Sequence, residues 1–174
     1  MELRNRVVMA PIETLFSADG GPSERDVLFY TERAREEVGL VITGGTVAHP
    51  TSLVRDRRML RGYDPATIPA FGRLAAAVHS EGARIIGQLT HRGRDLLAGE
   101  SDLPSWGATA SPSLRQPLVP HQMSTSDIKD LVAGFAMSAA NLRQVGYDGV
   151  EVHAAHGYLL AQFLNSTTNS RRDP

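Results

Sequence analysis

The feature that most constrains the fold is a regular alternation of short apolar runs with longer amphipathic segments. The runs lack a polar face, which is typical of parallel strands that are buried on both sides. Between them, apolar residues recur every three or four positions, which indicates helices. Alternation of this kind predicts an α/β chain with a parallel sheet and right-handed crossovers. The predicted strands lie at residues 7–9, 40–43, 83–89 and 148–153.

Each interval between the predicted strands contains one helical pattern, at residues 23–38, 68–80 and 124–145. Ser23 and Asp26 form a capping-box pattern at the start of the first helix. A glycine follows the last periodic residues of each helix, as expected of helix ends. A long connection rich in proline, serine and glycine precedes the third helix, and a loop of that length in a compact domain is usually functional.

Two architectures contain such a sheet: an open doubly wound sheet and a (β/α)8 barrel. The turn after the first strand, Ala10 to Glu13, lacks the glycine fingerprint of a dinucleotide-binding fold. Every strand instead leads into its own polar cluster, which favours a barrel with its chemistry at the strands' carboxyl ends. A barrel typically needs about 250 residues, and this chain has 174. We therefore expect residues 1–174 to be the N-terminal part of a single TIM-barrel domain, covering about its first four β/α units.

Composition excludes several classes of function. The chain carries 18 basic and 19 acidic residues, a formal net charge of -1, which gives no electrostatic basis for binding nucleic acid or an anionic membrane. It contains no cysteine, which excludes disulfides, thiolate metal sites and a cysteine nucleophile. The N-terminus lacks a signal-peptide pattern, and no apolar stretch reaches the length of a membrane span. We expect a cytoplasmic protein.

The fourth predicted strand leads into the most informative stretch of the chain. It is followed within six residues by His153, His156 and Tyr158. Taken alone, a His-x-x-His pair is compatible with two buried structural histidines or with a metal site, although no third ligand is evident nearby. The sequence continues with an apolar run and then Asn169-x-Arg171-x-Asp173.

The pattern His-Ala-Ala-His-Gly-Tyr-Leu-Leu-x-Gln-Phe-Leu, followed by Asn-x-Arg-x-Asp, resembles the signature of the Old Yellow Enzyme family of FMN-dependent ene-reductases. The resemblance extends from about Asn5 to Asp173. It implies that FMN lies across the mouth of a barrel and is reduced by NADH or NADPH. It also implies reduction of the C=C bond of an α,β-unsaturated carbonyl, with an enone or enoyl thioester as substrate.

The resemblance gives His153, His156 and Tyr158 catalytic and substrate-binding roles. The two histidines match a pair that holds the substrate carbonyl oxygen, and two donors on one oxygen stabilise the enolate that forms during reduction. Tyr158 matches the proton donor, because a phenol stays protonated at neutral pH and can protonate a developing carbanion. No metal ion is implied.

A second group of residues is implied to border the flavin. A flat ring needs close backbone approach, which glycine permits, and its polar edge needs donors and acceptors, which an amide side chain supplies in both senses. Without the resemblance, Gly44-Gly45 is simply a tight turn and Gln88 a polar strand end. The implied cofactor-binding residues are Pro11, Ile12, Glu13, Thr14, Gly45, Thr46 and Gln88.

Glu13 departs from the family pattern, which usually has Thr or Cys at this position. A carboxylate here would disfavour an anionic reduced flavin by charge repulsion, and a shift of one residue would give Thr14 the role instead. The departure points toward the subgroup that resembles 2,4-dienoyl-CoA reductases and amine demethylases. Oxidative N-demethylation, as in an amine dehydrogenase, is therefore the alternative reaction.

Three further alternatives stay open. Four strands leave two unpaired sheet edges, so the chain is also compatible with a non-catalytic half-barrel that acts as an interaction module. The basic loop from Arg55 to Arg61 would contact an acidic substrate or partner, or simply be solvated. A homo-oligomer is compatible with the sequence, which does not specify the oligomeric state.

Overall fold

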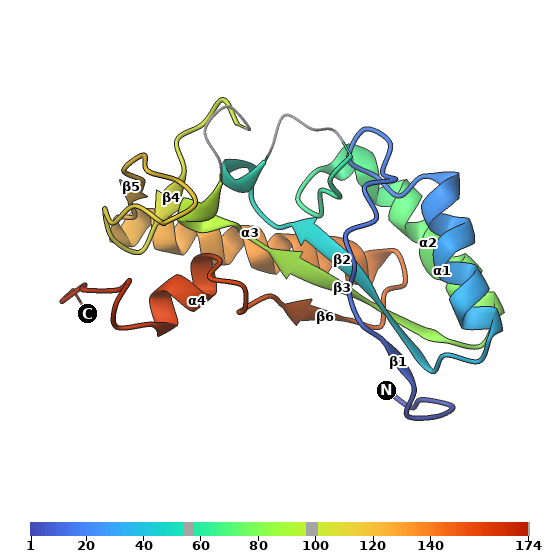
Figure 1. The fold of residues 1–174 in the computed structure, drawn as a ribbon. Coiled ribbons are helices and arrows are strands. Elements are labelled where there is room, and N and C mark those ends of the chain that lie inside the picture. Colours follow the sequence, from blue (N-terminus) through green and yellow to red (C-terminus); the bar gives the residue numbers. More distant parts are fainter. Residues whose placement is uncertain (54–57, 97–100, 174) are drawn as a thin grey trace.

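The computed structural model describes residues 1–53, 58–96 and 101–173 (Figure 1). Its main sheet contains four parallel strands in the order β1-β2-β3-β6. The four strands predicted from the sequence and their parallel pairing are confirmed. The predicted basic loop lies partly outside the described residues. The strands are β1 (Val8–Met9), β2 (Leu40–Val47), β3 (Arg84–Thr90) and β6 (Gly149–Val152).

The prediction that β2 ends before Gly44 is wrong, because the strand continues through both glycines to Val47. The register against β3 shifts between Thr43 and Thr46, as in a β-bulge. The two glycines lie in this irregular part of the strand. The strand β3 also continues to Thr90, so that Gln88 lies inside the strand and not at its end.

The three predicted helices are confirmed as α1 (Glu24–Arg35), α2 (Ile68–Ser80) and α3 (Thr125–Gln144). The Ser23 side chain accepts from the backbone N–H of Asp26 and the Asp26 carboxylate accepts from that of Ser23, which completes the predicted capping box. A second capping box, between Ser124 and Asp127, starts α3. These caps satisfy N–H groups that have no partner within the helix.

The helices pack side by side in chain order on one face of the sheet, α1 against α2 and α2 against α3 (Figure 1). Each new strand is likewise added beside the preceding one. A doubly wound sheet would reverse its strand order and place helices on both faces. The chain is therefore wound in one direction only, as the barrel prediction requires.

The core lies between the sheet and these helices. Its fully buried side chains include Phe71 and Leu74 of α2, Ile85 of β3 and Leu142 of α3. Each such side chain contributes roughly 1.5–3 kcal/mol by leaving water. The outermost strands differ, because Val8 is 45% and Val152 is 50% exposed. Both edges of the sheet thus keep accessible apolar side chains.

The long connection between β3 and α3 contains regular structure that the sequence did not predict. A 3-10 turn (Gly93–Asp95) follows β3, and the short strands β4 (Trp106–Gly107) and β5 (His121–Gln122) pair with each other. After β6 the chain forms a short helix, α4 (Leu159–Leu164). Two more 3-10 turns occur at Pro50–Ser52 and Pro65–Thr67. Of the helices described, none has the length and apolar character needed to cross a membrane.

Candidate functional site

His153, His156 and Tyr158 form one cluster directly after β6. The Tyr158 ring centroid lies 5.0 Å from that of His153 and 6.0 Å from that of His156. The Ala155 N–H donates to Nδ1 of His153, 3.2 Å away. Neutral His153 therefore carries its proton on Nε2, which lies 2.9 Å from Nδ1 of His156 and donates to it.

The surroundings of His153 favour its neutral form. Its side chain is buried, and burial lowers the pKa of His153 below the ordinary value of 6.5, with a further contribution from the neighbouring His156. His156 itself is exposed. The pair thus joins a buried, oriented ring to one that is open to solvent.

The turn that carries these rings has an uncommon backbone. His156 has φ 58° and the following Gly157 has φ 74°, so that two successive residues lie in the left-handed region. A residue with a side chain pays roughly 1–2 kcal/mol for this conformation. Such strain persists only where surrounding contacts impose it, and it tends to cluster at functional sites.

No group of three or more His, Asp or Glu side chains among the described residues is arranged to hold a metal ion. The nitrogen atoms of His153 and His156 that face each other are joined by a hydrogen bond.

Gln88 lies on β3, the strand next to β6. It is the register partner of Glu151, and its Nε2 donates to Glu151 Oε1 over 2.7 Å. The sequence prediction missed Glu151, although the two-residue period of a strand places it on the same face as His153. The carboxylate fixes the orientation of the predicted amide.

Glu13 and Gly45 lie at the same end of the sheet and meet there. A Cβ atom on Gly45 would lie 2.7 Å from Glu13 Oε1, so the glycine leaves space for this carboxylate. Glu13 Oε2 lies 3.6 Å from Nη2 of Arg92, which is the second residue after β3. Arg92 therefore supplies a positive counter-charge to Glu13 that the sequence prediction missed.

The other predicted flavin-side residues differ in exposure, and two of them bond to other parts of the protein. The Thr14 hydroxyl donates to Asp26 Oδ1 over 2.7 Å, which directs it toward α1. Thr46 is fully buried, and its hydroxyl donates to the Gly44 carbonyl. Ile12 is half exposed and Pro11 is partly buried.

A buried histidine supports the loop that carries Arg92. His91 accepts from the Gly93 N–H at Nδ1 over 3.0 Å, so its Nε2 donates to the Thr51 hydroxyl 2.9 Å away. The Thr51 hydroxyl is also 2.7 Å from His49 Nδ1. Burial, and then the nearby His49, lower the pKa of His91 from 6.5 to about 3.

This depressed pKa predicts acid lability. The unfolded chain binds a proton at His91 below pH 6.5 but the folded protein does not until about pH 3. Protonation of His91 therefore leaves the free energy of unfolding unchanged above pH 6.5. It lowers this free energy progressively as the pH falls from 6.5 toward 3. Urea denaturation at pH 7, 5.5 and 4 should show this decline. The variant His91→Gln should show a shallower decline, and an unchanged slope would contradict the assignment.

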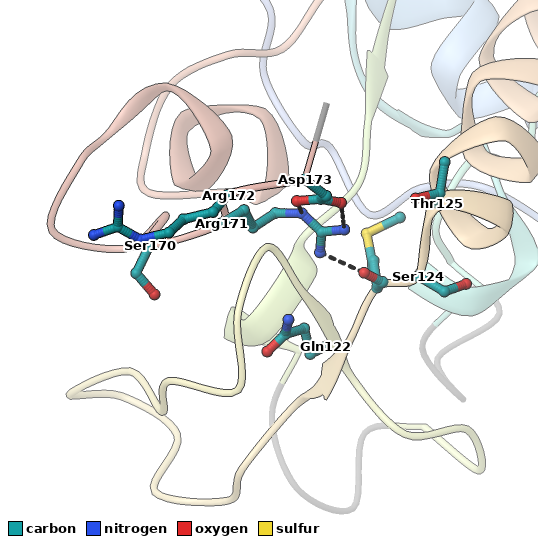
Figure 2. A pocket seen from close by; sticks show the side chains of 8 residues that line it. Gln122, Ser124, Thr125, Ser170, Arg171, Arg172 and Asp173 are labelled. Atoms are coloured by element: carbon teal, nitrogen blue, oxygen red, sulfur yellow. Dashed lines mark hydrogen bonds and ion pairs between the residues drawn. The ribbon is translucent and has the colours of Figure 1, made fainter.

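Arg171, near the end of the signature, joins separate segments of the chain. Arg171 donates to the backbone carbonyls of Ala108 and Met123 and pairs with Asp173. Arg171 lines a groove of about 630 Å³ between the start of α3 and residues 170–173. Figure 2 shows its guanidinium group between Asp173 and the start of α3. Arg171 thereby fastens the long connection to the end of the described chain.

Comparison with known proteins extends over the whole chain. The NADH:flavin oxidoreductase / NADH oxidase family matches residues 1–174. A metal reductase of Desulforamulus reducens is 34% identical over 99% of this chain and 26% of its own length. An NADPH dehydrogenase of Bacillus velezensis is 35% identical over 98% of this chain and 50% of its own length. The structure of Old Yellow Enzyme from Pichia sp. AKU4542 is 28% identical with a TM-score of 0.87, covering 99% of this chain and 48% of that one.

The chain thus spans between about a quarter and a half of the length of these relatives. The resemblance to Old Yellow Enzyme is confirmed, and the one-way winding agrees with the first half of its (β/α)8 barrel. The match over all 174 residues shows that the chain belongs to the NADH:flavin oxidoreductase / NADH oxidase family.

Proposed function

We propose that this chain supplies the substrate side of an FMN-dependent oxidoreductase that uses NADH or NADPH to reduce the C=C bond of an α,β-unsaturated carbonyl. Residues 1–174 are then the N-terminal part of a single FMN-binding barrel domain in a cytoplasmic enzyme. The observation that carries the proposal is the joining of His153, His156 and Tyr158 in one cluster at the carboxyl end of β6.

The loop after β1 and the strands β2 and β3 would border a flavin at this edge. Gly44 and Gly45 remove side chains where β2 approaches the loop after β1, since a Cβ at either would contact Ile12 or Glu13. Gln88 offers an amide whose orientation is set by Glu151. These residues would hold one side of the ring. When bound, FMN supplies the hydride chemistry, which the side chains of this site lack.

The histidine pair can bind a carbonyl oxygen with two donors. The neutral pair has one proton between its facing nitrogen atoms, on Nε2 of His153. An oxygen that accepts from both rings also needs a proton on Nδ1 of His156. Because His156 is exposed, a change of tautomer through solvent can supply that proton. Two fixed donors then stabilise negative charge that develops on the oxygen.

Tyr158 then supplies the remaining proton. Its ring packs against His153, so a substrate held by the histidine pair lies within reach of the phenol. The proton on the hydroxyl moves to the α-carbon of the substrate, and the resulting phenolate is reprotonated from water.

Steady-state assays with cyclohexenone, a 2,4-dienoyl-CoA and N-methylated amines test this proposal. We expect turnover of at least one of the two unsaturated carbonyl substrates with NADH or NADPH. Turnover of amines alone would contradict the proposal and favour oxidative demethylation. A colourless protein that acts on none of these substrates would favour the non-catalytic alternative.

A further inference from the structure

Gln162 links the histidine turn to the loop after β3. Its side chain is 2% exposed. The amide Nε2 donates to the carbonyl of Gly157 over 2.8 Å and to that of Arg92 over 3.3 Å, and its Oε1 accepts from the Arg94 N–H over 3.3 Å. Every polar group of this amide therefore has a backbone partner, on two segments that are far apart in the sequence.

The close packing around this amide shows that the link is specific. Gly93 has φ 63°, and a Cβ on it would lie 2.6 Å from Gln162 Oε1, so only glycine allows the approach. The turn is also held by the Leu159 N–H, which donates to the His91 carbonyl over 3.0 Å. Gln162 bonds to the turn itself, at the Gly157 carbonyl.

The hydrogen bond from Gln162 to the Gly157 carbonyl lies next to the strained backbone of the turn. Gly157 lies between His156, whose φ is 58°, and Tyr158. A left-handed residue with a side chain persists only where neighbouring contacts impose it. The bond to the Gly157 carbonyl is such a contact, because it fixes the peptide plane between Gly157 and Tyr158, directly after the left-handed pair.

We propose that Gln162 is a positioning residue that holds His156 and Tyr158 in place by anchoring the Gly157 carbonyl to the Arg92–Arg94 segment. It acts through the backbone and touches no reacting atom. The inference rests on the proposed function only where turnover is measured, since the placement of His156 can be observed without turnover.

Two substitutions at Gln162 test this role. Gln162→Met keeps the approximate volume but removes every side-chain hydrogen bond. Gln162→Glu replaces Nε2 with a carboxylate oxygen, which then faces the carbonyl oxygens of Gly157 and Arg92. We expect both variants to lose the NMR signal of the proton between His153 and His156. In the FMN-loaded protein, the oxidative half-reaction with cyclohexenone should slow by about 10²-fold, because a small misplacement of reacting groups has that effect.

Gln116 provides a matched control. It is also a buried glutamine, 3% exposed, and its Nε2 donates to the Leu96 carbonyl over 3.1 Å, in the long connection. Gln116→Met should lower the melting temperature but keep the imidazole proton signal and the oxidative rate. If Gln162→Met behaved in the same way, Gln162 would be a purely structural residue and the proposal would be wrong.

A measurement on the unmodified protein covers the case in which the Gln162 variants fail to fold. The oxygen of 4-chlorophenol can accept from two histidine donors as a carbonyl oxygen does, so this phenol serves as the probe. Its binding should slow hydrogen exchange of the Gln162 side-chain amide by about tenfold, because coupling between two sites is reciprocal. Unchanged exchange at saturating phenol would overturn the proposal. If the unmodified protein reduces no enone, the proposed function fails, but the imidazole proton signal of the variants still decides the role of Gln162.

Discussion

Replacing Tyr158 with phenylalanine is expected to slow the oxidative half-reaction with an enone by about 10²–10⁴-fold, the usual contribution of a general acid. The reductive half-reaction with NADH or NADPH should stay close to the original rate, because it needs no proton from this phenol. The ring should keep its packing against His153, since Phe retains the aromatic face. Stopped-flow measurement of the two half-reactions on the FMN-loaded protein separates these effects.

Two further variants make this result specific. Tyr63→Phe removes a phenol that packs against Val47, Met59 and Leu96, away from the cluster, and should leave both half-reactions unchanged. His156→Ala should instead weaken binding of the carbonyl as well as the rate, because a donor is lost in ground and transition states alike. An unchanged oxidative rate in Tyr158→Phe would show that water or another residue supplies the proton. Loss of FMN from that variant would indicate a structural role for the phenol.

The sequence predicted the elements that are long enough to show a period. The helix α2 begins and ends at the predicted residues, Ile68 and Ser80, because its apolar stripe spans several turns. The strands β4 and β5 have two residues each, which is too short for any period to appear. The helix α4 is almost entirely apolar, so its sequence shows no helical period. It has no side-chain cap either, so no residue pattern indicates where it begins.

From local spacing alone, the sequence could group only the site residues that lie in one short stretch. His153, His156 and Tyr158 lie within six residues and could be grouped from the sequence. Their supporting partners come from distant segments. Arg92 meets Glu13 across the sheet, and Gln162 reaches back to the same loop. Such pairs depend on register and on the packing of α4, and no local pattern specifies either.

The glycine pair in β2 illustrates the same limit and leads to the largest expected effect on stability. The sequence suggested a turn, because glycine weakens a strand. The structure instead keeps Gly44 in the strand, where a Cβ atom would lie 1.9 Å from the Ile12 carbonyl oxygen. The Gly44 N–H donates to the Tyr30 hydroxyl, which in turn donates to the same Ile12 carbonyl. The contact is therefore between two backbone segments that a buried tyrosine holds together.

Gly44→Ala is consequently expected to lower the free energy of unfolding by about 3 kcal/mol or more, since neither backbone can move without breaking these bonds. Gly72→Ala is the matched control. Gly72 lies inside α2, and its added Cβ would come no closer than 3.4 Å, to Val145 Cβ. Alanine there should raise stability by roughly 0.5–1 kcal/mol. Urea denaturation of both variants measures the difference. A Gly44→Ala protein as stable as the original would show that the loop after β1 can move away from β2 at little cost. The proposed flavin contacts of residues 11–14 would then lose their fixed support.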